Sequence, residues 1–193
     1  MVTMHFEDVQ RVMLQNKQIL EMFPFLWPVD EDGNKIPLEV FRFHATLADK
    51  IPQGWGRVFA KDLFERTRKI VLSEGIGLEN YQFIRIGVGG NRISIVGNIK
   101  NEKLQELFDE IEYISERICV DCGAPATRTS TITDLPVCEN CAMIISQKRG
   151  GPSREFKKYT PSEWIRFDGS RVFVYDGKEW KERKEESGEE KEE

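Results

Sequence analysis

The sequence predicts an α+β protein: helices packed on a small antiparallel sheet, with a four-cysteine zinc ribbon and a C-terminal β-meander. Three observations support this class. Apolar residues recur at three- and four-residue steps in three separate segments, which is typical of amphipathic helices. Short β-rich runs flank glycine turns, which favours hairpins. Two Cys-x-x-Cys pairs lie close together in the sequence, which indicates a metal site.

The cysteine pattern is the most specific of the three. Cys119, Cys122, Cys138 and Cys141 are the only cysteines, and fifteen residues separate the two pairs. Each Cys-x-x-Cys turn can supply one edge of a tetrahedron of thiolates, with Zn–S bonds of about 2.3 Å. Since all four predicted ligands are thiolates, no coordination position stays open for water. The sequence therefore predicts a structural Zn²⁺ and not a catalytic one.

Two other interpretations of these cysteines are a pair of disulfides in a secreted protein and a thioredoxin-like redox motif. No apolar signal segment opens the chain, and four cysteines in 193 residues are not a disulfide-dense composition. A thioredoxin-like motif would use one pair beside a βαβ pattern. The spacing favours zinc over both.

Composition sets limits on the class of protein. The formal net charge of −5 gives no signature of a general nucleic-acid binder. Residues 181–193 hold seven glutamates and four basic residues, so the rest of the chain is close to neutral. No apolar run reaches membrane length. Together with thiols kept free for metal, the lack of such a run predicts a cytoplasmic protein.

Three helices are expected, over residues 6–23, 57–73 and about 101–117. Pro24 should end the first, glycines 75 and 77 the second, and Asn98 or Asn101 should cap the third. The inward positions of the second helix are predicted to include Val58, Leu63, Ile70 and Val71, and those of the third Leu104, Leu107, Phe108, Ile111 and Ile114. The carboxylates of the third helix are predicted to form a solvated face: Glu102, Glu106, Asp109, Glu110, Glu112 and Glu116.

The segments between these helices are short. Residues 24–28 are apolar enough to pack on the core, and residues 30–34 form a turn that lacks the ligand spacing of a calcium loop. Residues 38–43 are expected to be extended, and residues 51–56 to form a turn with a buried Trp55.

A β-hairpin is expected around the glycines at positions 87, 89 and 90. Residues 81–86 precede them and residues 93–96 follow, and both runs are rich in isoleucine. A dinucleotide-binding loop would need the full Gly-x-Gly-x-x-Gly register opening a helix. Because a β-rich run comes next, the glycines indicate a hairpin turn.

Several basic residues lie near or after the second cysteine pair. They are Arg128, Lys148, Arg149, Arg154, Lys157 and Lys158. One interpretation is that residues 146–160 are a mobile connector. The other is a contact for nucleic acid or for an acidic partner surface.

The C-terminal part predicts a three-stranded meander over residues 163–167, 171–175 and 179–181. Its aromatic residues are either core or a stacking surface for nucleobases: Trp164, Phe167, Phe173, Tyr175 and Trp180. The predicted organisation is a body (1–117), a zinc ribbon (118–145), a basic connector (146–160), a meander (161–181) and a disordered acidic tail (182–193).

Several motifs recur together in one group of proteins. They are Pro24-Phe25-Leu26-Trp27-Pro28, Ile51-Pro52-Gln53-Gly54-Trp55, Tyr81-Gln82-Phe83-Ile84-Arg85-Ile86, and residues 114–127 closed by Cys138-Glu139-Asn140-Cys141. In these motifs the chain resembles uncharacterised zinc-ribbon proteins of bacteriophages and mobile elements of Gram-positive bacteria. The resemblance implies a phage-type origin and a zinc fold, but no reaction.

These observations lead to a functional expectation. The chain has only two histidines, His5 and His44, and no nucleophile in a recognisable motif. We therefore expect a non-enzymatic, phage-type accessory protein that binds a host or phage macromolecule. The resemblance adds inhibition of host defence as one such role. The alternatives are a nucleic-acid-binding zinc-ribbon protein and, third, a nuclease or hydrolase whose carboxylates meet only on folding. The sequence does not predict the oligomeric state.

Overall fold

The structure is a computed structural model, and it describes residues 6–148, 156–161, 163–168 and 171–183. The chain divides into two compact units, Met1–Tyr159 and Thr160–Glu193. The described elements are helices and small antiparallel sheets, so the α+β class is confirmed. None of the helices in the described part of the chain has the length and apolar composition needed to cross a membrane.

The first unit begins with α1 (Phe6–Met22) and the 3₁₀ turn η1 (Pro24–Leu26). Phe25 and Leu26 of η1 are fully buried, as predicted. The expectation of an extended segment at residues 38–43 was wrong, because α2 (Leu38–Phe41) is a short helix. The carbonyl of Pro37 accepts hydrogen bonds from the N–H groups of Val40 and Phe41, which closes this helical turn.

A continuous helical segment follows the 3₁₀ turn η2 (Leu47–Lys50). It consists of α3 (Gln53–Trp55), a π-helical turn η3 (Gly56–Ala60) and α4 (Lys61–Ser73). The helix therefore starts four residues before the predicted position, and the motif predicted as a turn is helical. Trp55 is buried, as predicted, whereas the predicted inward residue Val58 is 48% exposed.

The predicted hairpin is present as β1 (Phe83–Gly89) and β2 (Arg92–Gly97). Ile86 pairs with Ile95 and Val88 with Ile93, and the register shifts between Phe83 and Arg85. Gly90 adopts a φ of 67° at the turn, a conformation that glycine allows without steric cost.

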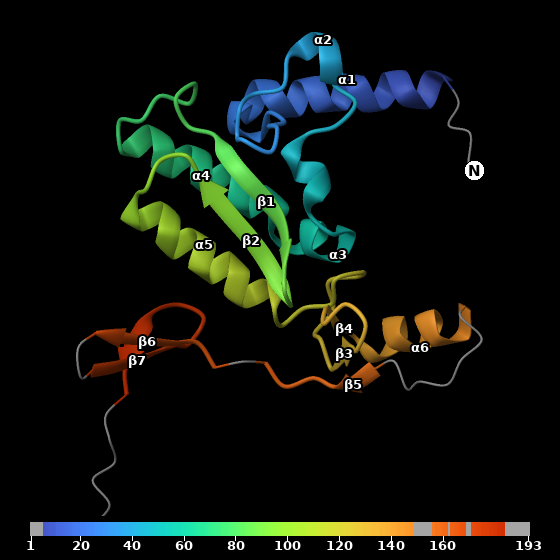
Figure 1. Ribbon diagram of the computed structural model, residues 1–193, viewed down its shortest axis with the longest axis vertical. Coiled ribbons are helices and arrows are strands. Elements are labelled where there is room, and N and C mark those ends of the chain that lie inside the picture. Colours follow the sequence, from blue (N-terminus) through green and yellow to red (C-terminus); the bar gives the residue numbers. More distant parts are fainter. Residues whose placement is uncertain (1–5, 149–155, 162, 169–170, 184–193) are drawn as a thin grey trace, which may run out of the picture. The chain divides into compact units, whose positions relative to one another are not determined.

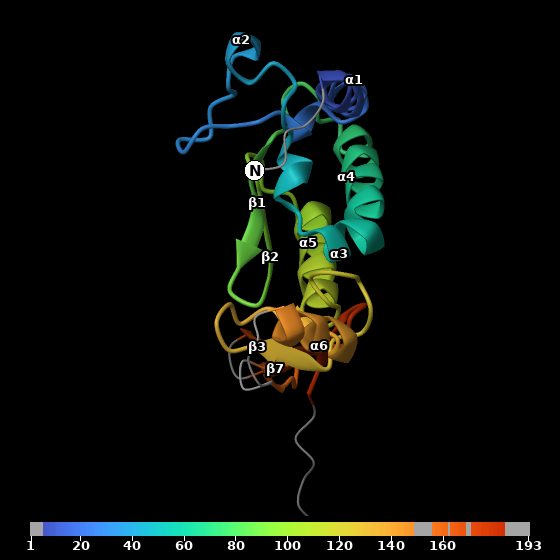
Figure 2. The same ribbon diagram turned by 90° about the vertical axis from the view of Figure 1, so that its right-hand side faces the viewer.

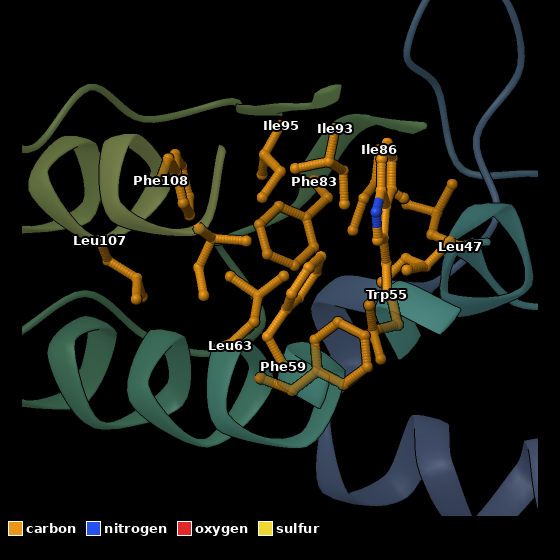
Figure 3. Close-up of a cluster of buried hydrophobic side chains, with 14 of the residues drawn as sticks. Leu47, Trp55, Phe59, Leu63, Phe83, Ile86, Ile93, Ile95, Leu107 and Phe108 are labelled. Atoms are coloured by element: carbon orange, nitrogen blue, oxygen red, sulfur yellow. The ribbon is translucent and has the colours of Figure 1, made fainter. Parts of the chain in front are cut away.

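Helix α5 (Glu102–Ser115) begins at Asn101, whose side-chain oxygen accepts a hydrogen bond from the N–H of Leu104. This confirms one of the two predicted caps. Helices α4 and α5 run beside each other against one face of the hairpin (Figures 1 and 2). Side chains from both helices and both strands meet in the core, where Leu63, Phe83 and Leu107 are almost completely buried (Figure 3).

One part of the α5 prediction was wrong. Glu116, just after the helix, is completely buried and does not belong to a solvated face. Its carboxylate pairs with Arg92 at 3.1 Å, and Arg92 also approaches Glu112 at 3.3 Å. These ion pairs tie the end of α5 to the hairpin, since a buried carboxylate needs a charged or hydrogen-bonding partner.

Residues 118–148 and 156–158 form a smaller substructure, which we call the module. It contains β3 (Arg128–Ser130), β4 (Pro136–Val137), α6 (Glu139–Lys148) and β5 (Phe156–Lys158). The strands form one sheet in the order β4-β3-β5. Part of the predicted connector is therefore a strand. Met143 and Ile144 of α6 are each 50% exposed.

The second unit is the predicted meander, with β6 (Ile165–Asp168), β7 (Arg171–Tyr175) and β8 (Trp180–Glu182). The ring of Tyr175 lies 6.1 Å from Trp164 and 5.3 Å from Trp180, measured between ring centroids. The side chain of Phe167 and the predicted acidic tail from residue 184 lie outside the described residues.

Candidate metal centre

The four cysteines lie together, as the sequence predicts. Their sulfur atoms are all within 4.8 Å of one another, and Cys122 Sγ is 3.6 Å from Cys138 Sγ. Four sulfurs around one Zn²⁺ would be about 3.8 Å apart, given tetrahedral geometry and the usual Zn–S bond. A disulfide needs about 2.0 Å, and all four cysteines are free. The arrangement can therefore hold a metal ion.

A tight turn positions the first pair. The N–H of Gly123 donates to the carbonyl of Cys119 at 2.9 Å, and the N–H of Cys119 donates to the carbonyl of Ala124 at 2.6 Å. Gly123 has a φ of 82°, which explains why glycine directly follows the pair. This turn faces both sulfurs toward one point, and we call residues 119–124 the knuckle.

The second pair is at the start of a helix. Cys138 directly precedes α6, and its carbonyl accepts a hydrogen bond from the N–H of Ala142 at 3.0 Å. The N–H of Cys141 points at Cys138 Sγ from 3.4 Å. The unpaired N–H groups and the dipole at a helix N-terminus stabilise negatively charged sulfur. Strands β3 and β4 connect this pair to the knuckle, so the order is knuckle, hairpin, helix.

The electrostatic environment differs among the thiols. Burial raises the pKa of Cys119 and of Cys141 above the ordinary thiol value. The N–H of Ala124 lowers the pKa of Cys122, which is the exposed member of the set. A metal ion would compete with protons for all four sulfurs, so its affinity should fall in acid.

The knuckle and the residue before it accept hydrogen bonds from the body through their backbone carbonyls. The N–H of Gly54 donates to the carbonyl of Val120 at 2.8 Å, and Trp55 Nε1 donates to the carbonyl of Ile118 at 3.2 Å. A Cβ at Gly54 would lie 2.6 Å from the nitrogen of Cys122, a separation that Cβ atoms do not adopt. Position 54 therefore needs glycine so that the two backbones can approach.

Sequence reasoning missed this contact. The Pro-Gln-Gly-Trp motif was interpreted as a turn with a buried tryptophan, and only its place in the resemblance linked it to the cysteines. A glycine beside a buried tryptophan was the available signal, because glycine often marks a close backbone approach. The helix at α3 brings Gly54 and Trp55 to the knuckle together.

The structure brings together only some of the predicted basic residues. Arg128 and Lys158 are directly opposite each other on β3 and β5. Arg128 donates two hydrogen bonds to the carboxylate of Glu139, at 2.7 and 3.0 Å, so Glu139 balances its charge. Lys148, Lys157 and Lys158 are exposed. Arg149 and Arg154 lie outside the described residues.

Two hollows flank Phe156 between α6 and the sheet of the module. One, of about 250 Å³, is lined by the Arg128–Glu139 ion pair and by Ala142, Met143 and Phe156. The other, of about 200 Å³, is lined mostly by apolar side chains and reaches Asp121 of the knuckle. The nearby side chains Ile132, Met143 and Ile144 are 61%, 50% and 50% exposed. The candidate metal centre thus lies beside a hollow with a mostly apolar lining, which includes Val120 and Asp121 of the knuckle.

Comparison with known proteins does not identify the function of this site. No protein-family model, curated protein or solved structure matches the chain. The function of the site must therefore be inferred from its geometry and its chemistry.

Proposed function

We propose that the four cysteines bind one structural Zn²⁺, and that the protein is a non-enzymatic, phage-type accessory protein. In this proposal it binds another protein through the module that the metal holds in shape. The phage-type origin rests on the resemblance of the sequence motifs alone. Inhibition of host defence, in the host cytoplasm, is the role that this resemblance favours.

Donor chemistry supports the choice of metal. Four thiolates are the set that structural zinc sites use, and hard cations such as Ca²⁺ or Mg²⁺ prefer oxygen. With four protein ligands, zinc has no position left for a water molecule or a substrate. The ion would therefore have a structural role and would not catalyse a reaction, which supports a non-enzymatic function.

The exposed apolar side chains of the module are the observation that carries the binding proposal. Helix α6 has Ala142 on its buried side but leaves Met143 and Ile144 half exposed. Ile132, on the turn between β3 and β4, is exposed further. Exposed apolar groups beside a hollow are typical of protein-binding surfaces, and methionine adapts well to different partners.

The test is a quantitative pull-down from host lysate with matched variants. The double variant Met143→Ser, Ile144→Ser should lose a protein that the wild type recovers in stoichiometric amount. The control is Leu14→Ser, Leu72→Ser, which removes two side chains of similar exposure from α1 and α4. Equal recovery by both double variants, or no stoichiometric partner for the wild type, would contradict the proposal.

Nucleic-acid binding is the second candidate, because Lys157 and Lys158 are adjacent and exposed on β5. The bidentate pairing of Arg128 with Glu139 reduces the free positive charge beside them. If this candidate is correct, affinity for single-stranded oligonucleotides should fall steeply with salt and further in Lys157→Gln, Lys158→Gln. Equal and negligible binding at low salt by wild type and variant would eliminate it.

A further inference from the structure

The smaller hollow of the module has a specific chemistry. Six apolar residues line it: Val120, Ile132, Leu135, Val137, Ile145 and Phe156. Among the described lining residues Asp121 alone carries a charge, and it is exposed and follows directly on the buried Val120 of the knuckle. Among the residues that the structure describes, no lysine or arginine lines this hollow and no cation pairs with Asp121.

The metal centre adds to the negative charge at this end of the hollow. Four thiolates outweigh the charge of one Zn²⁺, so an occupied site keeps a net charge of about −2. Asp121 is the residue between Val120 and the ligand Cys122, and both Asp121 and Cys122 are exposed. The knuckle therefore presents negative charge to solvent directly beside an apolar surface, and this field attracts cations and repels phosphates.

We infer that this hollow binds a short peptide segment of a partner protein, with an aliphatic side chain in the hollow and an adjacent lysine or arginine at Asp121. The inference rests on the proposed function and specifies the partner chemistry at one part of the module. The apolar side chain gains from leaving water, and the cation gains from the field of the knuckle. Nucleic acid is not the occupant, because phosphates would meet negative charge there.

The probe is a fluorescein-labelled hexapeptide of alternating leucine and lysine, titrated into full-length, zinc-loaded protein at low salt. Two matched peptides replace lysine by glutamate or leucine by serine. We expect the leucine–lysine peptide to shift the amide NMR signals of Asp121, Ile132 and Ile145. The serine–lysine peptide should bind about tenfold more weakly, because it lacks the apolar anchor. The leucine–glutamate peptide should shift none of these signals.

Variants separate the two parts of the site. Asp121→Asn should weaken leucine–lysine binding about threefold, the size expected for an exposed charge contact, and raised salt should remove this difference. Its control, Glu31→Gln, removes one exposed carboxylate from the turn at residues 30–34 and should not change affinity. Ile132→Ser should weaken binding more than Val40→Ser, although Val40 is the more exposed side chain.

The outcomes are distinguishable from failure of the proposed function. Protein that contains no zinc would contradict the proposed function itself. Zinc-loaded, folded protein that fails to bind the leucine–lysine peptide, or binds it equally as Asp121→Asn, would overturn this inference and leave the zinc proposal in place. Equal binding of the serine–lysine peptide, or a single-stranded oligonucleotide that shifts the Asp121 and Ile132 signals, would overturn it as well.

Discussion

The body and the module are stabilised in different ways. The body buries large apolar side chains almost completely, among them Leu63, Phe83, Ile93 and Leu107. In the module the buried apolar residues are few and small, chiefly Val120, Val137 and Ala142 beside the buried cysteines. Burial of apolar surface can hold the body together without a metal. If the four cysteines hold the proposed Zn²⁺, a substructure with so little buried apolar surface should depend on that ion for folding.

Loss of a metal ligand should have the largest effect. Zinc binding by small structural sites is worth about 10–16 kcal/mol at neutral pH, so Cys119→Ser should unfold the module. Amide exchange should become fast at residues 118–148, while the amides of β1, β2 and α5 stay protected. In a Trp27→Phe, Trp164→Phe, Trp180→Phe background, the emission of Trp55 should shift to the red, because its contact with Ile118 is lost.

The control for this prediction is chelation of the wild type followed by addition of Zn²⁺. Chelation should reproduce the effect of Cys119→Ser, and re-addition should reverse it. A module whose amides stay protected without metal would show that the body and the module are stabilised alike.

A cavity in the body should lower the stability of the body and leave the zinc content of the module unchanged. Leu63 is completely buried, so Leu63→Ala should lower the free energy of unfolding by about 2–5 kcal/mol. The matched variant Leu72→Ala, at a 52% exposed position of the same helix, should cost less than about 0.5 kcal/mol. Denaturant unfolding followed by circular dichroism measures both. Zinc content should stay at the wild-type value in each, and loss of zinc from Leu63→Ala under native conditions would count against separate stabilisation.

The junction between the two regions is tested by Gly54→Ala. The new Cβ would collide with backbone atoms of the knuckle, which cannot rotate away, so unfolding should become easier by about 1–3 kcal/mol. Affinity for zinc, measured by competition with a chelator, should fall too. Gly56→Ala is the control, since the nearest atom to its Cβ would be 4.0 Å away and its backbone is helical. This control should be neutral or slightly stabilising.

The smallest effect concerns the second unit, where a surface contact orders the turn before β8. Lys181 donates to the carboxylate of Asp176 at 2.7 Å, and this contact, followed by the N–H groups of Glu179 and Lys178, lowers the pKa of Asp176 to about 2. Because the folded pKa lies below the ordinary value of 3.8, the contact stabilises the turn above pH 3.8 and is lost as the pH falls through about 2. In a carboxyl NMR titration, Lys181→Met should raise this pKa toward 3.8. An unchanged midpoint would show that the N–H groups of Lys178 and Glu179 account for the shift.

The sequence predicted those parts that depend on local pattern. The positions of α1, the hairpin, α5 and the meander follow from apolar periodicity and glycine turns. The four cysteines were predicted to meet because their spacing alone is specific for a metal site.

The parts that sequence reasoning missed depend on tertiary contacts. The burial of Glu116 requires Arg92, which is 24 residues away in the sequence. The start of α6 within the second cysteine pair, and the exposure of Met143 and Ile144, follow from how the helix packs on β3. A short run of apolar residues does not indicate which side chains face inward, because hydrophobic periodicity is recognisable only over a longer stretch of sequence.

X-ray absorption at the zinc edge of chelator-free, purified protein tests the central claim most directly. The account predicts one zinc per chain, with four sulfur neighbours at about 2.3 Å and no oxygen or nitrogen in the first coordination sphere. Protein without metal, or a spectrum that requires oxygen or nitrogen ligands, would contradict it.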